Sequence, residues 1–534
     1  MGNENATIGL ARAHHIQRTS ERRLTEQRHS LEWKVILSRP GIAVPFLLFL
    51  FLLMRAIVLI FFSFRYVDQD QVTMMLSAKE MVEGLFHEPC FWGQRYGFML
   101  EALLSVPLLW GRMAVEHAVP LVTCMLGILP FLIICYAAIR NGRPALAAMA
   151  LAVPLIYTVE YDILTSMPRG WVAGLAVSSV PLLWHLKPQT RISLFVLGLC
   201  GAAGLIINPN SIYLTAFIGA HVLVAHRKLW WQLLWILAGT ALPLALFVLA
   251  QRFYDVHPGY DFHGSPSLRF SIEQLIVNMG RLDDFFRYVA PVAPVLGWAA
   301  FLLMPVAASI IMVKLDKVKG VIYLILFACA AASLGIEKVN DSHAALFFSG
   351  ARFFFALPIL TVFLMHDLLS ALRVDMVRIM PVVCLIAALG VANSCIRLGV
   401  LYPNIEKVGK LHWVSVDEVS AIKIRCAQLN KLAKQQRVEL IIFENDADQL
   451  LNYGCPCFTK DFPPTLFPWY ERRTWLLQEA SSRTVQNILF VNPLKHRPEF
   501  SGYRPYGQND FVYKGNRTNT LELLNSLNYV IRPF

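Results

Sequence analysis

Long apolar runs separated by short polar turns fill the first three quarters of the chain. Most runs are about 17–25 residues long, the length that an α-helix needs to cross the apolar core of a bilayer. The pattern predicts about eleven transmembrane helices, near 41–63, 119–139, 144–158, 169–185, 192–207, 211–225, 229–250, 292–313, 320–336, 352–369 and 378–397. The predicted fold class is therefore a polytopic α-helical membrane protein.

The basic residues of the short turns all fall on one side of this arrangement. Cytoplasmic loops of membrane proteins are enriched in Lys and Arg, so that side is predicted to be cytoplasmic, together with the Arg-rich tail 1–40. The assignment requires the apolar segment 98–110, about thirteen residues long, not to cross the membrane. The loop 64–118, called loop one below, is then external, and the C-terminus is external too. The basic residues concerned are Arg140, Arg143, Lys187, Arg191, Arg227, Lys228, Lys314, Lys317, Lys319, Arg373 and Arg378.

After the membrane domain, 41–397, the pattern changes to alternating helical and strand-like segments. Helical periodicity covers Val416 to Gln436, Trp469 to Ala480 and Leu521 to Leu527, whereas Val438 to Phe443 and Ile488 to Val491 resemble strands. Alternation of the two types predicts a small extracytoplasmic α/β domain over 398–534.

Composition supports the membrane assignment and constrains the partners. The chain is 56% hydrophobic and 16% charged, with a mean hydropathy of +0.50. Its net charge of +12 is spread over short turns and forms no basic stripe interleaved with aromatic residues, so nucleic acid is not the expected partner. Three of the ten cysteines lie in the predicted external domain. There a disulfide from Cys426 to Cys455 or Cys457 and three free thiols are equally expected.

Two carboxylates, Asp68 and Asp70, directly follow the first apolar run. Ionisable groups at a membrane boundary are costly to place and tend to be functional. Low-dielectric walls beside such a group would raise its proton affinity, as a general base requires. The alternative is structural, because aspartate also caps the N-terminus of a helix.

Several motifs in this order resemble the GT-C glycosyltransferases, particularly the bacterial aminoarabinose transferases and the protein O-mannosyltransferases. Asp70 through Met81 matches the external acidic stretch of that family, and Gln94-Arg95-Tyr96-Gly97 with 98–110 matches its second loop-one helix. Residues 139–147 match a basic turn, and 351–358 match a late-span Arg-Tyr-x-Leu-Pro motif. The resemblance covers roughly residues 41–370. It departs from the family at Asp70-Gln71, where the family has Asp-Glu, and at Met167-Pro168, where it has Asp-Pro.

The resemblance implies an inverting transfer of a sugar from a polyprenyl-phosphate carrier to a glycan, lipid or protein acceptor. Asp70 would be the general base and Asp68 its helper, while Arg352 and Lys338 would bind the donor phosphate. Relatives often use a divalent ion (Mg, Mn or Zn), for which Asp70, Asp162 and His257 are weak candidates. Structural alternatives to these roles stay open. Arg352 could be an interfacial anchor, and the histidines could be solvated loop residues. Further residues expected to line the site are Glu101, Arg95, Tyr96, Asp162 and His343.

Two other functions compete with glycosyl transfer. A transporter or flippase would show internal repeats and charges at the membrane midplane, whereas the charges here gather at the outer ends of the predicted spans. An acyl or phosphoethanolamine transferase would need metal-ligand spacing that the histidines lack. The expected location is the bacterial inner membrane, with a cytoplasmic N-terminus and a periplasmic C-terminus. The sequence does not indicate which sugar is transferred.

Overall fold

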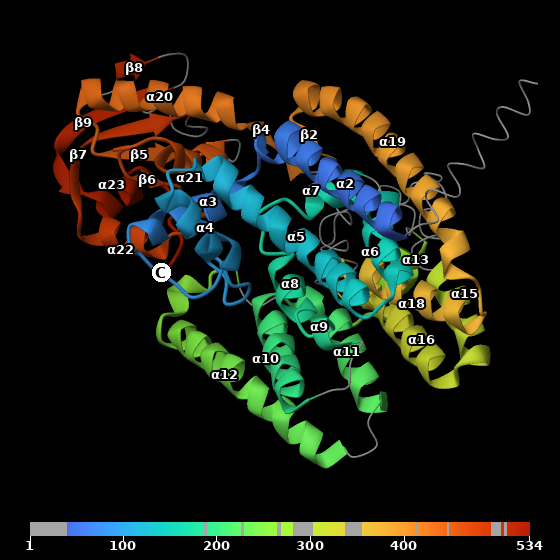
Figure 1. Ribbon diagram of the computed structural model, residues 1–534. Coiled ribbons are helices and arrows are strands. Elements are labelled where there is room, and N and C mark those ends of the chain that lie inside the picture. Colours follow the sequence, from blue (N-terminus) through green and yellow to red (C-terminus); the bar gives the residue numbers. More distant parts are fainter. Residues whose placement is uncertain are drawn as a thin grey trace, which may run out of the picture.

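The computed structural model describes residues 40–157, 159–185, 190–225, 229–263, 269–280, 303–336, 355–411, 414–445, 448–492, 504–506 and 510–534. These residues form a mostly helical body with a mixed β-sheet and its helices gathered at one end (Figure 1). The tail 1–39 lies outside the described residues.

In the first part of the chain, α3 and α4 follow one long helix in the sequence and precede another. The elements in order are α2 (Pro40–Val58), continued by η1 (Leu59–Ser63), then β1 (Tyr66–Val67), α3 (Gln69–Val82), α4 (Leu100–Trp110) and α5 (Val115–Arg140). Helix α4 has 11 residues and reaches only about 16 Å, half the thickness of a bilayer core. That 98–110 does not cross the membrane stays a prediction.

The middle of the chain consists of shorter helices and one long one. They are α6 (Pro144–Ile156), α7 (Val159–Leu164), α8 (Ala173–Ser179), α9 (Leu182–His185), α10 (Arg191–Ile207), η2 (Pro209–Ser211), α11 (Ile212–Ala225), α12 (Leu229–Val256), η3 (Pro258–Tyr260) and α13 (Ile272–Met279). The span predicted at 169–185 is not one helix. It begins only at Ala173 and is interrupted before Leu182, because Pro181 has no N–H to continue the hydrogen-bond ladder.

Among the described residues, four further α-helices precede the C-terminal domain: α15 (Met304–Leu315), α16 (Lys317–Ala332) with η5 (Ser333–Gly335), α18 (Leu357–Ala371) and α19 (Met376–Val408). Five described helical segments are long and apolar enough to cross a membrane, and seven shorter apolar helices accompany them. The chain is thus described as a multi-pass membrane protein, while the count of eleven spans stays a prediction. The five are Pro40–Ser63, Val115–Arg140, Leu233–Val256, Lys317–Gly335 and Met376–Val408.

The C-terminal region folds around a five-stranded mixed sheet of order β6-β5-β7-β9-β8. Strand β5 pairs in parallel with β6 and β7, whereas β9 pairs antiparallel with β7 and β8. The elements are β2 (Lys410–Leu411), β3 (Val414–Ser415), β4 (Asp417–Glu418), α20 (Val419–Gln436), β5 (Leu440–Phe443), α21 (Gln449–Phe458), β6 (Thr465–Leu466), α22 (Thr474–Ser482), β7 (Thr484–Val491), β8 (Arg504–Tyr506), β9 (Asp510–Asn519) and α23 (Thr520–Ser526).

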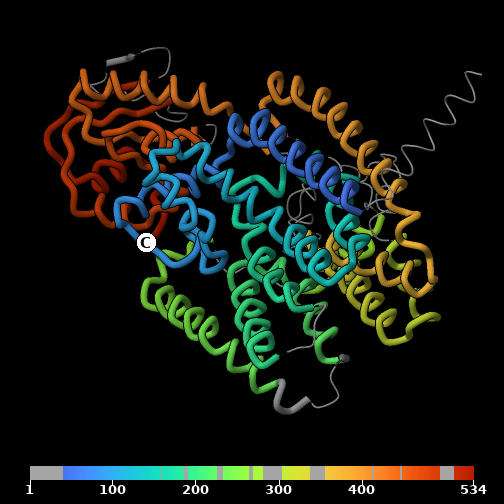
Figure 2. Tube along the Cα trace, in the orientation of Figure 1, coloured from blue at the N-terminus to red at the C-terminus, as the bar shows by residue number. Residues whose placement is uncertain are grey.

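The segment after the first span and the C-terminal domain share one hydrophobic core. Buried residues of α3, such as Met74 and Met75, pack in one cluster with Ile422 of α20 and Tyr453 of α21. Strand β1 pairs antiparallel with β4, which joins the two segments by backbone hydrogen bonds. In Figure 2 the blue loop-one trace accordingly lies against the red C-terminal domain. The predicted external loop is therefore built into the C-terminal domain.

Candidate active site

Asp68 and Asp70 lie at the start of α3, directly after β1. Asp68 has an extended backbone and is the N-cap of α3, since its Oδ1 accepts the Gln71 N–H at 2.9 Å. The capping role left open for Asp68 is thus observed. Asp70 lies in the first turn of α3 and keeps 32% of its side chain exposed, whereas that of Asp68 is only 4% exposed. Of the two carboxylates, Asp70 is the more accessible one.

The first cation beside the two carboxylates is Arg169, from the turn between α7 and α8. Its Nε donates to Asp68 Oδ2 at 2.8 Å, and its Nη1 lies 3.4 Å from Asp70 Oδ2. One guanidinium therefore bridges both acids, a geometry that the fork of arginine donors favours.

The turn is fixed by Gly170, which follows Arg169. Gly170 has a φ of +75°, a left-handed conformation that glycine adopts without a steric cost. Its N–H donates to Glu101 Oε2 at 2.9 Å, and its carbonyl accepts from Asn208 Nδ2 at 2.9 Å. Helix α4 and the end of α10 thereby hold the position of Arg169.

The second cation is Arg472, from the C-terminal domain. Its Nη1 donates to Asp70 Oδ1 at 2.7 Å, and its side chain is only 7% exposed. The backbone N–H of Arg472 donates to Tyr453 Oη at 3.1 Å, which anchors Arg472 to α21. Asp68, Asp70, Arg169 and Arg472 are called the acid–arginine cluster below.

The cluster controls the protonation of its acids. Burial alone would raise the pKa of Asp70, but the charges of Arg472 and Arg169 outweigh it and lower that pKa below its usual value. The expectation of a raised proton affinity at Asp70 is therefore wrong for this state. Burial, aided by the charge of Asp70, raises the pKa of Asp68 despite Arg169. Burial and the charge of Arg472 lower the pKa of the nearby His263 to about 4, so that His263 is neutral at pH 7.

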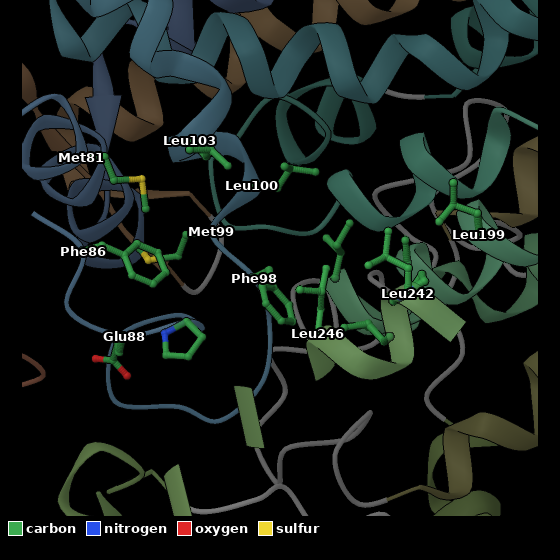
Figure 3. Close-up of a pocket in the computed structure, with 15 residues that line it drawn as sticks. Met81, Phe86, Glu88, Phe98, Met99, Leu100, Leu103, Leu199, Leu242 and Leu246 are labelled. Atoms are coloured by element: carbon green, nitrogen blue, oxygen red, sulfur yellow. The ribbon is translucent and has the colours of Figure 1, made fainter. Parts of the chain in front are cut away.

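An apolar cavity of about 370 Å³ lies between loop one, α10 and α12 (Figure 3). The one acid in its wall is Glu88, whose carboxylate accepts from the Gly93 N–H and the Tyr254 hydroxyl. Burial raises the pKa of Glu88 well above its usual value, which favours the neutral form. The lining residues are Met81, Phe86, Glu88, Pro89, Phe98, Met99, Leu100, Leu103, Leu199, Ala203, Ile206, Ile207, Leu242, Pro243 and Leu246.

One chain segment connects the cavity to the acid–arginine cluster. Phe98, Met99 and Leu100 form part of the cavity wall. The next residue, Glu101, accepts a hydrogen bond from the N–H of Gly170. Gly170 in turn follows Arg169. The cavity wall and the turn that carries Arg169 thus both contact the start of α4.

The other predicted site residues have different partners. Arg95 donates to Gln251 and Asp255 at 2.8 and 2.9 Å, beside the partly buried Tyr96. Asp162 pairs with Arg55 of the first span at 2.9 Å. His257 lies 3.0 Å from the Phe253 carbonyl through its Nδ1. Three more predicted residues, Arg352, Lys338 and His343, lie outside the described residues.

No group of three or more His, Cys, Asp or Glu side chains suited to a metal ion occurs among the described residues. The three metal candidates are also not brought together by a shared partner. Asp70 is bound by Arg472, Asp162 by Arg55, and His257 by a backbone carbonyl.

Sequence reasoning missed both arginines of the cluster. Arg169 carried a signal, because it is a basic residue predicted at the outer end of a span, against the positive-inside pattern. Arg472 carried a weaker one, as part of the charged triplet Glu471-Arg472-Arg473 inside the segment predicted as helical from Trp469. That helix begins only at Thr474, since Glu471 folds back to accept from Arg473 and the Phe467 N–H.

The chain matches no known protein-family model and no curated protein. The GT-C resemblance therefore rests on the order and spacing of the motifs.

Proposed function

We propose that this protein transfers a sugar from a polyprenyl-phosphate-linked donor to an acceptor at the outer face of the membrane, with Asp70 as general base. The observation that carries the proposal is the placement of the partly exposed Asp70 carboxylate. It lies just beyond the end of the first span, between the guanidinium groups of Arg169 and Arg472. The start of α4 links the turn that carries Arg169 to the wall of an apolar cavity.

The reaction needs a base, a site for the leaving phosphate and a place for the apolar carrier. Asp70 would take the proton of the acceptor hydroxyl while the hydroxyl oxygen attacks the anomeric carbon from the face opposite the phosphate. The bond between that carbon and the phosphate oxygen breaks, and polyprenyl phosphate leaves with the bonding electrons. Attack from the opposite face inverts the anomeric centre.

The cavity suits the first units of a prenyl chain. Its volume of about 370 Å³ is within the usual range for small-molecule pockets, about 300–1,000 Å³. Its walls from α10 and α12 belong to an apolar helix pair, so the rest of the carrier would lie in the bilayer. The proposed location is a bacterial inner membrane, with the acid–arginine cluster on the periplasmic side.

Substitution of Asp70 tests the proposed function. In membranes supplied with a lipid-linked sugar, Asp70→Asn is expected to lose at least about 100-fold in transfer rate, because loss of a general base typically costs that much. Asp375→Asn is the matched control, since Asp375 also lies at a helix N-terminus, as the cap of α19. Transfer by Asp70→Asn at the wild-type rate would refute the base assignment. Translocation of the lipid-linked sugar without any transfer would favour the flippase alternative.

A further inference from the structure

Arg472 reaches the cluster with unused hydrogen-bonding capacity. A guanidinium has five N–H donors, and Arg472 gives Nη1 to Asp70. Its Nε is buried and has no hydrogen-bond partner among the described residues. The side chain lies over the rings of Phe91 and Tyr470, which leaves its position fixed by packing rather than by Asp70 alone.

Arg169 and Arg472 meet Asp70 from separate parts of the molecule. Arg169 binds Asp70 Oδ2 from the turn after α7, whereas Arg472 binds Oδ1 from the C-terminal domain. Asp68 and His263 are further titratable groups beside Asp70. Two guanidinium groups around one partly exposed carboxylate also form a geometry that binds a phosphate.

We propose that Arg169 and Arg472 form the binding site for the phosphate of the donor, and that this phosphate displaces the Asp70 carboxylate from them. The identity of the ligand rests on the proposed function. Without donor, Asp70 occupies the arginines and is held in an inactive ion pair. With donor bound, the two guanidinium groups stay in place and bind the phosphate instead, and the displaced Asp70 carboxylate is free to take a proton.

The exchange resolves a conflict between geometry and chemistry. While Arg472 and Arg169 bind Asp70, their charges lower its pKa and make it a poor base. Once the phosphate shares those charges and adds its own negative charge beside Asp70, the proton affinity of Asp70 rises. The base would then become active only when a donor is in place, which prevents proton uptake in the empty site.

The charges balance through the reaction. The phosphodiester of the donor carries one negative charge, and the departing polyprenyl phosphate monoester carries close to two at pH 7. Asp70 loses its negative charge on taking the acceptor proton, so the total charge of the site does not change. The second charge on the phosphate develops beside two arginines that are already in place, as electrostatic stabilisation of a transition state requires.

Binding of farnesyl phosphate to the full-length protein in nanodiscs tests the exchange. Asp70→Asn is expected to bind this probe at least about tenfold more tightly than the wild type, because the arginines no longer have to leave a carboxylate. Arg472→Met is expected to bind at least about tenfold more weakly. Arg425→Met is the control, since Arg425 belongs to the same domain but pairs with Asp510. Farnesol, which has no phosphate, should bind all four proteins equally.

Two results would overturn the exchange: an Asp70→Asn protein that binds farnesyl phosphate no better than the wild type, or an Arg472→Met protein that binds it equally well. Unfolding temperatures identify variants that fail to fold, and Arg472→Lys then replaces Arg472→Met with a smaller expected loss. A transfer assay separates the two proposals. Tighter binding by Asp70→Asn without any transfer by the wild type retains the exchange and rejects the transferase. Transfer without tighter binding rejects the exchange alone.

Discussion

Glu101 supports the turn that carries Arg169, through the backbone of Gly170. Its side chain is fully buried and accepts the Gly170 N–H, and burial raises the pKa of Glu101 to about 7. Between pH 4.5 and about pH 7, Glu101 is ionised in the unfolded chain but still protonated in the folded protein. The free energy of unfolding therefore falls as the pH rises through this range. Above pH 7 the ionised Glu101 carboxylate lowers the stability of the folded protein by its full amount, about 3 kcal/mol at most.

Glu101→Gln keeps the acceptor and removes the charge. At pH 5 we expect its unfolding temperature to lie close to that of the wild type, and at pH 8 we expect it to be higher. Thermal unfolding in detergent at both pH values measures the difference. Glu522→Gln, at an exposed glutamate of α23, should follow the wild type at both. A pH dependence that is the same for Glu101→Gln and the wild type would contradict the buried-carboxyl account.

Individual site residues differ in how far the sequence can reveal them. Asp70 was identified because a carboxylate beside an apolar run is unusual in itself. Its partners were not, because Arg169 lies 101 positions from Asp68, and Arg472 lies 402 positions from Asp70. Pairing across such distances depends on how the loops pack, and hydrophobic periodicity carries no information about that.

At the scale of single elements, periodicity predicted type better than boundaries. Helix α20 begins at Val419 rather than Val416, and β5 begins at Leu440 within the strand predicted at 438–443. Strand β7 contains the strand predicted at 488–491 and begins earlier, at Thr484. The errors lie where local chemistry interrupts a pattern. Pro181 divides the span predicted at 169–185, and the Glu471–Arg473 ion pair replaces the first turn of the predicted 469–480 helix. The second interruption includes Arg472, whereas Pro181 lies at the far end of α8 from Arg169.

One covalent link joins two elements beside the site. Cys426 of α20 is bonded to Cys455 of α21, which was one of the two pairings predicted. Helix α21 also accepts hydrogen bonds from Lys79 of α3 through the carbonyls of Pro456 and Cys457, at 2.7 and 3.3 Å. Because α3 carries Asp70, the disulfide supports the surface against which the candidate base is held.

Cys455→Ser is expected to cost about 2–4 kcal/mol of stability, the usual range for a native disulfide. Reduction of the wild type should lower its unfolding temperature about as much as the Cys455→Ser substitution does. Reduction of Cys455→Ser itself should have little further effect on the unfolding temperature. Cys395→Ser, at an exposed free cysteine, is the control. Maleimide labelling of Cys426 in the native protein before any reduction would show that the link does not form.

At the scale of the whole molecule, the acid–arginine cluster requires loop one and the C-terminal domain to be on the same side of the membrane. Their shared core and the β1–β4 pair supply that requirement independently of any charge rule. Helix α19, with 33 residues, extends about 50 Å and is long enough to cross the bilayer and still reach the domain. The disulfide favours an oxidising compartment for this side.

Reporter fusions test this arrangement. Alkaline phosphatase is active only outside the cytoplasm, so fusions after Val256 and Asn516 are expected to be active and those after Asn141 and Arg373 inactive. A fluorescent protein that matures only in the cytoplasm should give the opposite pattern at the same four positions. If α4 crossed the membrane, every fusion after it would reverse. Loop one before α4 and the C-terminal domain would then lie on opposite sides, and the Asp70–Arg472 pair could not form. Activity after Asn141 would therefore contradict the topology, the candidate site and the proposed exchange together.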